Sequence, residues 1–166
     1  MTLTAASPLS GYNRAVAALG RPPLSKLIVT KAEFQELAEV RLVEAKSLLD
    51  QAMWNGAYYL AGYAVELALK ACVIKSLMAT DAFPEKEFSK DCYTHAVEKL
   101  VKLAKLDGPL TTAMDADPDL RANWPVARDW SEAKRYHRID KTEAEALYAA
   151  IADDSHGVLP WIKTQW

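Results

Sequence analysis

The sequence predicts an all-α fold, an antiparallel up-and-down bundle of four main helices plus short extra helices. Three observations predict it. Apolar residues recur every three or four positions in successive long segments, as on the buried face of a helix. Helix-start patterns precede two of these segments, namely Thr30 followed by Glu33 and Asp140 followed by Glu143. No segment shows the two-residue alternation of apolar and polar residues that is typical of a strand.

The first two predicted helices carry the strongest signals. Thr30 and Glu33 form a capping-box pattern, and the apolar positions after them predict a helix over 31–54. Asn55-Gly56 then predicts a turn or a short interruption. The next helix, over 57–79, is apolar around most of its circumference and rich in Ala, which predicts a slim helix at the centre of the bundle.

The middle of the chain predicts a loop and two further helices. Residues 80–93 are polar and contain a proline, which is typical of a loop. Helical spacing resumes after Thr94, a residue type that caps helix starts, and Gly108 fits the end of that helix. A fourth helix is predicted to run to about Arg135, and Pro125 fits either its first turn or a kink.

The two ends of the chain complete the organisation. The last helix follows Asp140, and Gly157 and Pro160 predict a break or bend near its end. Residues 1–29, in which turn-forming segments flank a short helical stretch, predict an N-terminal extension. The bundle domain is therefore expected over 30–166.

The composition is that of an ordinary soluble domain. A length of 166 residues suits one domain with one core. The net charge of −2 gives no general attraction to nucleic acid or anionic membranes, so any nucleic-acid contact needs a local basic patch. Cys72 and Cys92 form no C-x-x-C motif and no secretory signal is evident, so we expect reduced thiols and a cytoplasmic location. Glu66 interrupts the longest apolar run, so no membrane span is expected.

Polar side chains of the second helix lie on one narrow stripe. At about 100° per residue, Tyr59, Tyr63, Glu66 and Lys70 share one face of an otherwise apolar helix. A buried charge without a partner costs several kcal/mol. Glu66 and Lys70 must therefore face water, a polar cleft or charges on another helix.

A matching stripe is predicted in the fourth helix, formed by Trp124, Arg128, Glu132 and Arg135. We expect the two stripes to face each other, with Glu66 close to Arg128 or Arg135. The alternative stays open that the stripes form a solvated face, or an ion-pair network that only sets the register of the helices.

The stretch AYYLAGYAVELALKA, residues 57–71, and several later pieces of sequence resemble the HEPN family over about residues 31–163. The later pieces are THAVEKLVKLA, a Trp and the pair RY before the final helix, and WI near its end. The resemblance implies an antiparallel helical bundle, often a homodimer, with a role that involves nucleotides or RNA. Many members are metal-independent ribonucleases, including toxins paired with a nucleotidyltransferase-like antitoxin, and others bind nucleotide or RNA without catalysis.

This sequence departs from the catalytic pattern of that family, in which an Arg precedes a His by a short fixed spacing near the last two helices. Arg128 lies too far before His137 for that pattern, and Arg135 lies too close to it. The sequence therefore names no catalytic residue. The candidate ligand-binding residues are Tyr63, Glu66 and Lys70 on the second helix, Arg128 and Arg135 as phosphate contacts, and His137 as a ring that can stack on a base.

The preferred hypothesis is a non-catalytic, HEPN-like bundle that binds a nucleotide or RNA, as part of a toxin–antitoxin or defence system. The first alternative is a ribonuclease toxin that uses Arg135 and His137 across a dimer. The second alternative is a protein-interaction module. The basic cluster around Arg135 also fits a solvated helix end, where cations are favoured by the helix dipole.

Two other histidines are expected to be structural. His95 follows Thr94 at a predicted helix start, where it closes the helix end. His156 lies beside Asp153 and Asp154, but three residues within one turn are weak support for a metal site. We therefore expect no metal and no cofactor.

Overall fold

The described part of the chain is all-α. The computed structural model describes residues 29–80 and 85–166, and none of these residues forms a β-strand. The predicted N-terminal extension, with its short helix, lies outside the described residues apart from its last residue. The elements follow in the order α2 (Lys31–Asp50), α3 (Trp54–Met78), α4 (Lys86–Asp91), α5 (Val97–Leu103), α6 (Asp107–Ala116), α7 (Pro118–Arg128), the 3-10 helix η1 (Glu132–Tyr136), α8 (Lys141–Ala152) and α9 (Val158–Lys163).

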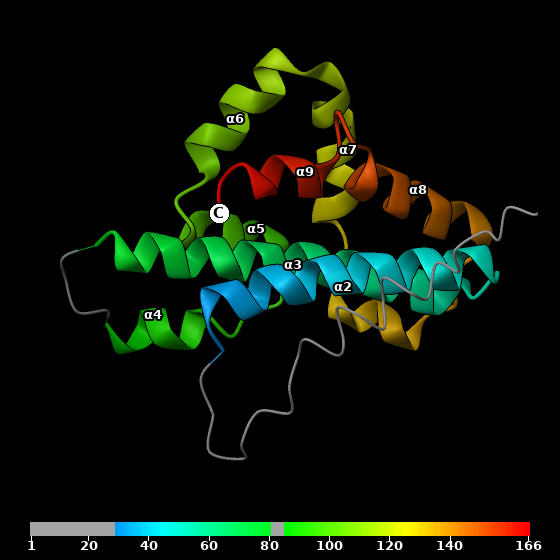
Figure 1. The fold of residues 1–166 in the computed structure, drawn as a ribbon, viewed down its shortest axis with the longest axis horizontal. Helices are drawn as coiled ribbons and strands as arrows, with labels where there is room; N and C mark the ends of the chain where they lie inside the picture. The colour runs from blue at the N-terminus through cyan, green and yellow to red at the C-terminus, as the bar shows by residue number, and fades with distance from the viewer. Residues whose placement is uncertain (1–28, 81–84) are drawn as a thin grey trace, which may run out of the picture.

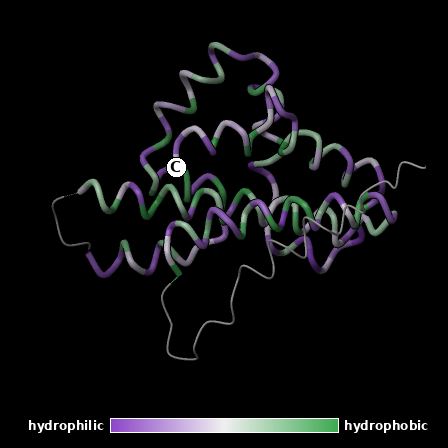
Figure 2. The backbone as a smooth tube through the Cα atoms, in the orientation of Figure 1, coloured by the Kyte–Doolittle hydropathy of each residue, from purple (hydrophilic) through white to green (hydrophobic). Residues whose placement is uncertain are grey.

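Helix α3 forms the core of the fold (Figure 1). Helix α2 packs along it, and α5, α8 and α9 cover its other sides. The buried residues of α3 are mostly Ala, Leu and Val, so burial of apolar surface explains its central position. Hydrophobic residues recur along α3 in Figure 2, whereas α4 is mostly hydrophilic. By length and composition α3 could cross a membrane, but 72% of its most apolar window is buried inside the protein.

Several predicted helix boundaries are confirmed. The Thr30 side chain accepts a hydrogen bond from the backbone N–H of Glu33, whose own side chain accepts from the backbone N–H of Thr30. Asp140 accepts in the same way from the backbone N–H of Glu143. Gly157 separates α8 from α9, and a Cβ atom there would lie only 2.3 Å from a backbone oxygen.

Other boundaries differ from the prediction. Helix α2 ends earlier than expected, because Ala52 adopts a left-handed φ of 59° that cannot continue the helix. Gly108 lies in the first turn of α6 and does not end the preceding helix, which stops at Leu103, and α4 occupies part of the predicted loop. Pro125 lies inside α7. That helix ends at Arg128 and not near Arg135, so the fourth predicted helix is too long.

Trp130 gives the physical reason for the early end of α7. Its side chain is 2% exposed and packs directly on α3, where a Cβ atom added to Gly62 would lie 2.2 Å from the indole ring. The chain must leave the axis of α7 after Arg128 to place the ring there. The indole Nε1 has no hydrogen-bond partner among the described residues, a cost of about 1–3 kcal/mol that burial of the large ring offsets.

The arrangement places two distant segments on one side of α3. In the view of Figure 1, α4 and η1 lie below α3, whereas α6, α7, α8 and α9 lie above it. Helix η1 also contacts α3. The connection between α4 and α5 and the segment after α7 can therefore approach the same polar stripe of α3.

Candidate functional site

Glu66 is fully buried in α3, with 0% of its surface exposed. Its two carboxylate oxygens have different partners. Oε1 accepts a hydrogen bond from Lys70 Nζ at 2.8 Å, and Oε2 lies 2.9 Å from His95 Nδ1. Lys70 lies one turn further along α3, whereas His95 lies between α4 and α5. These two contacts explain why the core tolerates a carboxylate, because an unpartnered one would cost several kcal/mol.

His95 connects this buried carboxylate to η1. Its Nε2 atom lies 2.9 Å from Glu132 Oε2. The two ring nitrogens of His95 therefore face two different carboxylates, Glu66 on α3 and Glu132 on η1. The side chain of His95 is 43% exposed, so part of the ring is open to solvent.

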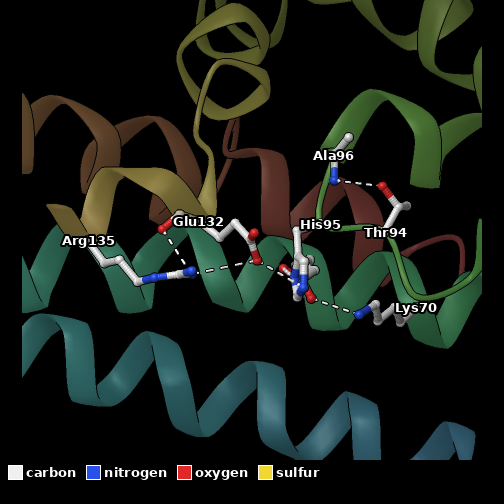
Figure 3. A network of polar contacts seen from close by, with 7 residues as sticks. Lys70, Thr94, His95, Ala96, Glu132 and Arg135 are labelled. Carbon is white, nitrogen blue, oxygen red and sulfur yellow. Dashed lines mark hydrogen bonds and ion pairs between the residues drawn. The ribbon is translucent and has the colours of Figure 1, made fainter. Parts of the chain in front are cut away.

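Arg135 extends the chain of contacts along η1. Its Nη1 atom lies 3.7 Å from the same Glu132 Oε2 and donates to the Glu132 backbone carbonyl at 3.3 Å. Figure 3 shows Arg135, Glu132, His95 and Lys70 in one row beside α3. We call these four residues and Glu66 the polar network.

The backbone before α5 positions His95. Thr94 Oγ1 accepts a hydrogen bond from the backbone N–H of Ala96 at 3.2 Å (Figure 3), which forms a tight local turn. Helix α5 begins immediately afterwards at Val97, which is 1% exposed. Thr94 was predicted as the helix cap, but Ala96 is the cap residue, and the turn between Thr94 and the buried Val97 directs His95 back to α3.

The polar network contains three of the predicted site residues, Glu66, Lys70 and Arg135. Their association is indirect, because two further side chains stand between Glu66 and Arg135. The prediction placed Glu66 close to Arg128 or Arg135, and the partners of its carboxylate are instead Lys70 and His95. Arg128 bonds to Asp129, its neighbour in the chain, at 2.8 Å. Because α7 ends there, the helical spacing that related Arg128 to Arg135 does not continue into η1.

The remaining predicted site residues lie beside the polar network. The side chain of His137 is exposed, and its backbone carbonyl accepts a hydrogen bond from Asn55 Nδ2 at 2.6 Å, which ties the end of η1 to α3. The half-buried Tyr63 stacks on Tyr59 with ring centroids 6.0 Å apart. Burial, and secondarily the negative charge of Glu66, raises the pKa of the Tyr63 hydroxyl.

Two strongly exposed tyrosines adjoin the polar network in sequence. Tyr93, at 82% exposure, comes just before the turn that carries His95. Tyr136, at 77% exposure, follows Arg135, and the guanidinium lies 4.7 Å from the centroid of its ring. A hydrogen bond with Tyr136 is the largest cause that raises the pKa of Arg135, so this cation stays charged. Exposed aromatic rings next to cations are surfaces on which unpaired bases stack.

A second titratable cluster joins the start of α7 to the turn between α8 and α9. His156 Nδ1 lies 2.9 Å from Asp117 Oδ2, and its Nε2 lies 3.8 Å from Asp119. The hydrogen bond between His156 and Asp117 raises the pKa of the histidine and lowers that of the carboxyl. The possible ligand atoms of Asp117, Asp119 and His156 lie within 4.8 Å of one another, and a metal there would have to displace the proton from the hydrogen bond between His156 and Asp117. Asp153, considered from the sequence with Asp154, instead accepts a hydrogen bond from the backbone N–H of His156.

Sequence reasoning missed the role of His95, which was expected only to close a helix end. Its partner Glu66 lies 29 positions earlier, and no local spacing relates the two residues. The sequence feature that could have indicated this role is Thr94 directly before His95, after a polar loop. A Thr hydroxyl that bonds to the backbone of a turn helps to fix the conformation of the residue that follows it.

Comparisons of the chain with protein-family models, with curated proteins and with solved structures find no match. Its function is therefore inferred from the geometry of the polar network, and the HEPN resemblance stays an expectation from the sequence.

Proposed function

We propose that this protein binds the phosphate of a nucleotide or of single-stranded RNA at the polar network, on a HEPN-like bundle and without cleaving it. One observation carries the proposal. His95 and Arg135, from separate segments of the chain, both face a single carboxylate oxygen. A position shared by two cationic donors suits the oxygen of a phosphate, which forms charge-assisted hydrogen bonds with both.

The charge of the polar network supports anion binding. Lys70 and Arg135 balance the two carboxylates, Glu66 and Glu132, so the group is net positive when His95 is protonated. Glu66 is rigid because it is buried and bonded through both oxygens. The ring of His95 is therefore already oriented before a ligand arrives, which lowers the entropic cost of binding.

The exposed aromatic residues extend the proposal from phosphate to nucleotide. Tyr93 and Tyr136 adjoin the two cationic residues and present most of their surface to solvent. Stacking of a base on an aromatic side chain contributes about 1–3 kcal/mol and is tolerant of sequence. The ligand class is therefore a nucleotide or an unpaired RNA strand, whose bases are free to stack.

Titration calorimetry with AMP and ATP, and fluorescence anisotropy with a labelled single-stranded RNA of about ten nucleotides, test the proposal. Arg135→Ala should weaken binding at least about tenfold, equivalent to about 1.4 kcal/mol. With RNA it should also reduce the slope of log K against log salt by about 0.7. Arg128→Ala is the matched control, because both guanidinium side chains are 42% exposed and Arg128 bonds to Asp129 outside the polar network.

Two results would overturn the proposal. The first is wild-type protein that binds none of these probes at about 1 mM, where even a weak interaction of about 4 kcal/mol is detected. The second is equal weakening by Arg128→Ala and Arg135→Ala, which would assign the effect to general charge. A stable protein partner that co-purifies with a chain unable to bind nucleotide would favour the protein-interaction module instead.

The family resemblance also implies partners. We include in the proposal a homodimer in the cytoplasm and a nucleotidyltransferase-like antitoxin as a second protein. Sedimentation analysis tests the first part, and a chain that stays monomeric at every concentration contradicts it. Co-expression with a small nucleotidyltransferase encoded beside this chain tests the second part.

A metal-independent ribonuclease is the second candidate function. The observation that favours it is that a histidine and an arginine meet at one oxygen position although no sequence motif relates them. In such a reaction the ribose 2′-hydroxyl attacks the adjacent phosphorus, the bond to the 5′ oxygen breaks, and a 2′,3′-cyclic phosphate and a 5′-hydroxyl result. A neutral His95 would accept the proton of the 2′-hydroxyl and return it to the leaving 5′ oxygen, and Arg135 would stabilise the phosphate charge.

The test is RNA cleavage in the presence of EDTA, with the product ends identified by mass spectrometry. His95→Ala should abolish cleavage, whereas His137→Ala should leave it intact, because the side chain of His137 is exposed beside the network. Loss of cleavage in His137→Ala alone would favour the arrangement expected from the sequence, with Arg135 and His137 acting across a dimer.

A further inference from the structure

Glu132 occupies the place where the proposed ligand phosphate would bind. Its Oε2 atom lies 2.9 Å from His95 Nε2 and 3.7 Å from Arg135 Nη1. In Figure 3 its carboxylate stands between the two cationic side chains. The carboxylate therefore already lies where a phosphate oxygen would contact His95 and Arg135, so a ligand and Glu132 compete for the same position.

The two carboxylates of the polar network are held very differently. Glu66 is 0% exposed and bonded through both oxygens, so it cannot leave. The side chain of Glu132 is 37% exposed and starts a five-residue 3-10 helix, a weakly hydrogen-bonded element. A rotation about its side-chain bonds moves the Glu132 carboxylate into water without leaving a buried charge unpaired.

The cationic donors keep their places when Glu132 rotates away. His95 stays bonded through Nδ1 to the buried Glu66. Arg135 stays bonded to the backbone carbonyl of Glu132, which does not move with the side chain. An incoming phosphate therefore meets two oriented donors and needs no rearrangement of the bundle.

We propose that Glu132 is a built-in competitor that a ligand phosphate displaces, and that it makes the site selective for terminal phosphate monoesters over internal phosphodiesters. This inference rests on the proposed function and concerns the regulation and ligand class of the same site. A monoester carries up to two negative charges near neutral pH and offers three terminal oxygens, so it outcompetes a single carboxylate. An internal phosphodiester carries one negative charge, the same as the Glu132 carboxylate, so it displaces that carboxylate less readily.

The test compares wild type with Glu132→Gln, which keeps the size of the side chain and removes its charge. The probes are AMP, inorganic phosphate, adenosine, and the same short single-stranded RNA with a 5′-phosphate or a 5′-hydroxyl. Glu98→Gln on α5 is the matched control, because it changes the net charge equally and Glu98 is 66% exposed in a pair with Lys102. Circular dichroism of all three proteins checks that the fold is unchanged.

We expect Glu132→Gln to bind AMP and phosphate at least about tenfold more tightly than wild type, and Glu98→Gln to differ less than about twofold. Wild type should bind the 5′-phosphorylated RNA more tightly than the 5′-hydroxyl RNA. Glu132→Gln should reduce this preference, because removal of the competing carboxylate increases the affinity for the unphosphorylated strand more. The affinity for adenosine should be the same in both variants as in wild type, since adenosine carries no phosphate.

The outcomes separate this inference from the proposed function. If wild type binds AMP and Glu132→Gln binds it equally or more weakly, Glu132 orients the cations or is inert, and the competitor role is wrong while the binding function stands. An equal gain in Glu98→Gln also overturns it. If wild type and Glu132→Gln both fail to bind every probe, the phosphate-binding function itself is wrong and this inference with it.

Discussion

The substitution Glu66→Gln tests the physical basis of the polar network most directly. The amide keeps the shape of the side chain but removes the charge that Lys70 and His95 share. Each charge-assisted hydrogen bond contributes about 1.5–3 kcal/mol, and a neutral replacement about 0.5–1.5 kcal/mol. In addition, the NH2 group of the glutamine faces either Lys70 or His95, where the wild-type carboxylate oxygen accepted a hydrogen bond. Breaking a fully buried pair costs about 3–5 kcal/mol.

The cations limit the loss because they retain some contact with water. Lys70 is 17% exposed and His95 is 43% exposed, so both are partly solvated once the carboxylate is gone. We therefore expect Glu66→Gln to lower the free energy of unfolding by about 2–3 kcal/mol. In a chain of this size that corresponds to a fall in Tm of roughly 5–10 °C. Urea or thermal unfolding followed by circular dichroism measures both quantities.

The chain contains a matched control for this experiment. Glu98 and Lys102 have the same four-residue spacing and order as Glu66 and Lys70, but their side chains are 66% and 63% exposed and lie 3.5 Å apart. Glu98→Gln should therefore lower the free energy of unfolding by less than about 0.5 kcal/mol. If Glu66→Gln costs no more than Glu98→Gln, the burial and pairing of Glu66 do not stabilise the fold, and the reasoning above is refuted.

Three further predictions follow from contacts elsewhere in the protein. Gly62→Ala should lower the free energy of unfolding by roughly 1–3 kcal/mol or more in urea unfolding, because the new Cβ atom would overlap the buried Trp130 ring. The pKa of His156 is raised by Asp117, so its stabilising contribution is complete below pH 6.5 and disappears as the pH rises through the raised value. The stability lost in His156→Gln should therefore be larger at pH 6 than at pH 9. Burial raises the pKa of the Cys72 thiol to about 11, so this thiol should not react with DTNB at pH 8 until the protein unfolds.

Each of these predictions has a control within the chain. For the glycine, a Cβ atom added at Gly108 meets no heavy atom within 4 Å apart from its chain neighbours, so Gly108→Ala should cost less than Gly62→Ala, although the following Pro109 limits any gain. A loss of stability there equal to that of Gly62→Ala would contradict the steric argument. For the histidine, an effect of His156→Gln that is constant with pH excludes the ion pair. For the thiol, Cys92 is the partly exposed comparison, and equally fast labelling of Cys72 would show that the core opens readily.

The sequence was sufficient for the parts of this fold that depend on neighbouring residues. The capping pair Thr30 and Glu33 and the cap at Asp140 depend on residues three positions apart, and both are present in the structure. The mostly apolar circumference of α3 required a central position, because a helix with only a narrow polar stripe must be covered on most sides. The line of Tyr63, Glu66 and Lys70 along that helix could be predicted for the same reason.

The end of α7 and the composition of the candidate site depended on tertiary contacts. Helical periodicity could not show that Trp130 packs on Gly62, so it could not show that the chain leaves the helix before Glu132 and Arg135. The pairing of Glu66 with His95 joins α3 to a turn whose position is set by packing of α5.

By itself the sequence determined an all-α chain built around one apolar helix that carries an unavoidable charge. The four-residue spacing of Glu66 and Lys70 along one helix is also a property of the sequence, whereas only the tertiary structure decided that His95 contacts Glu66 and that Glu132 faces His95 from η1. The physical reason is the range of the interactions. Periodicity and capping act within a few residues, whereas an ion pair between distant segments forms only after burial has brought their backbones together.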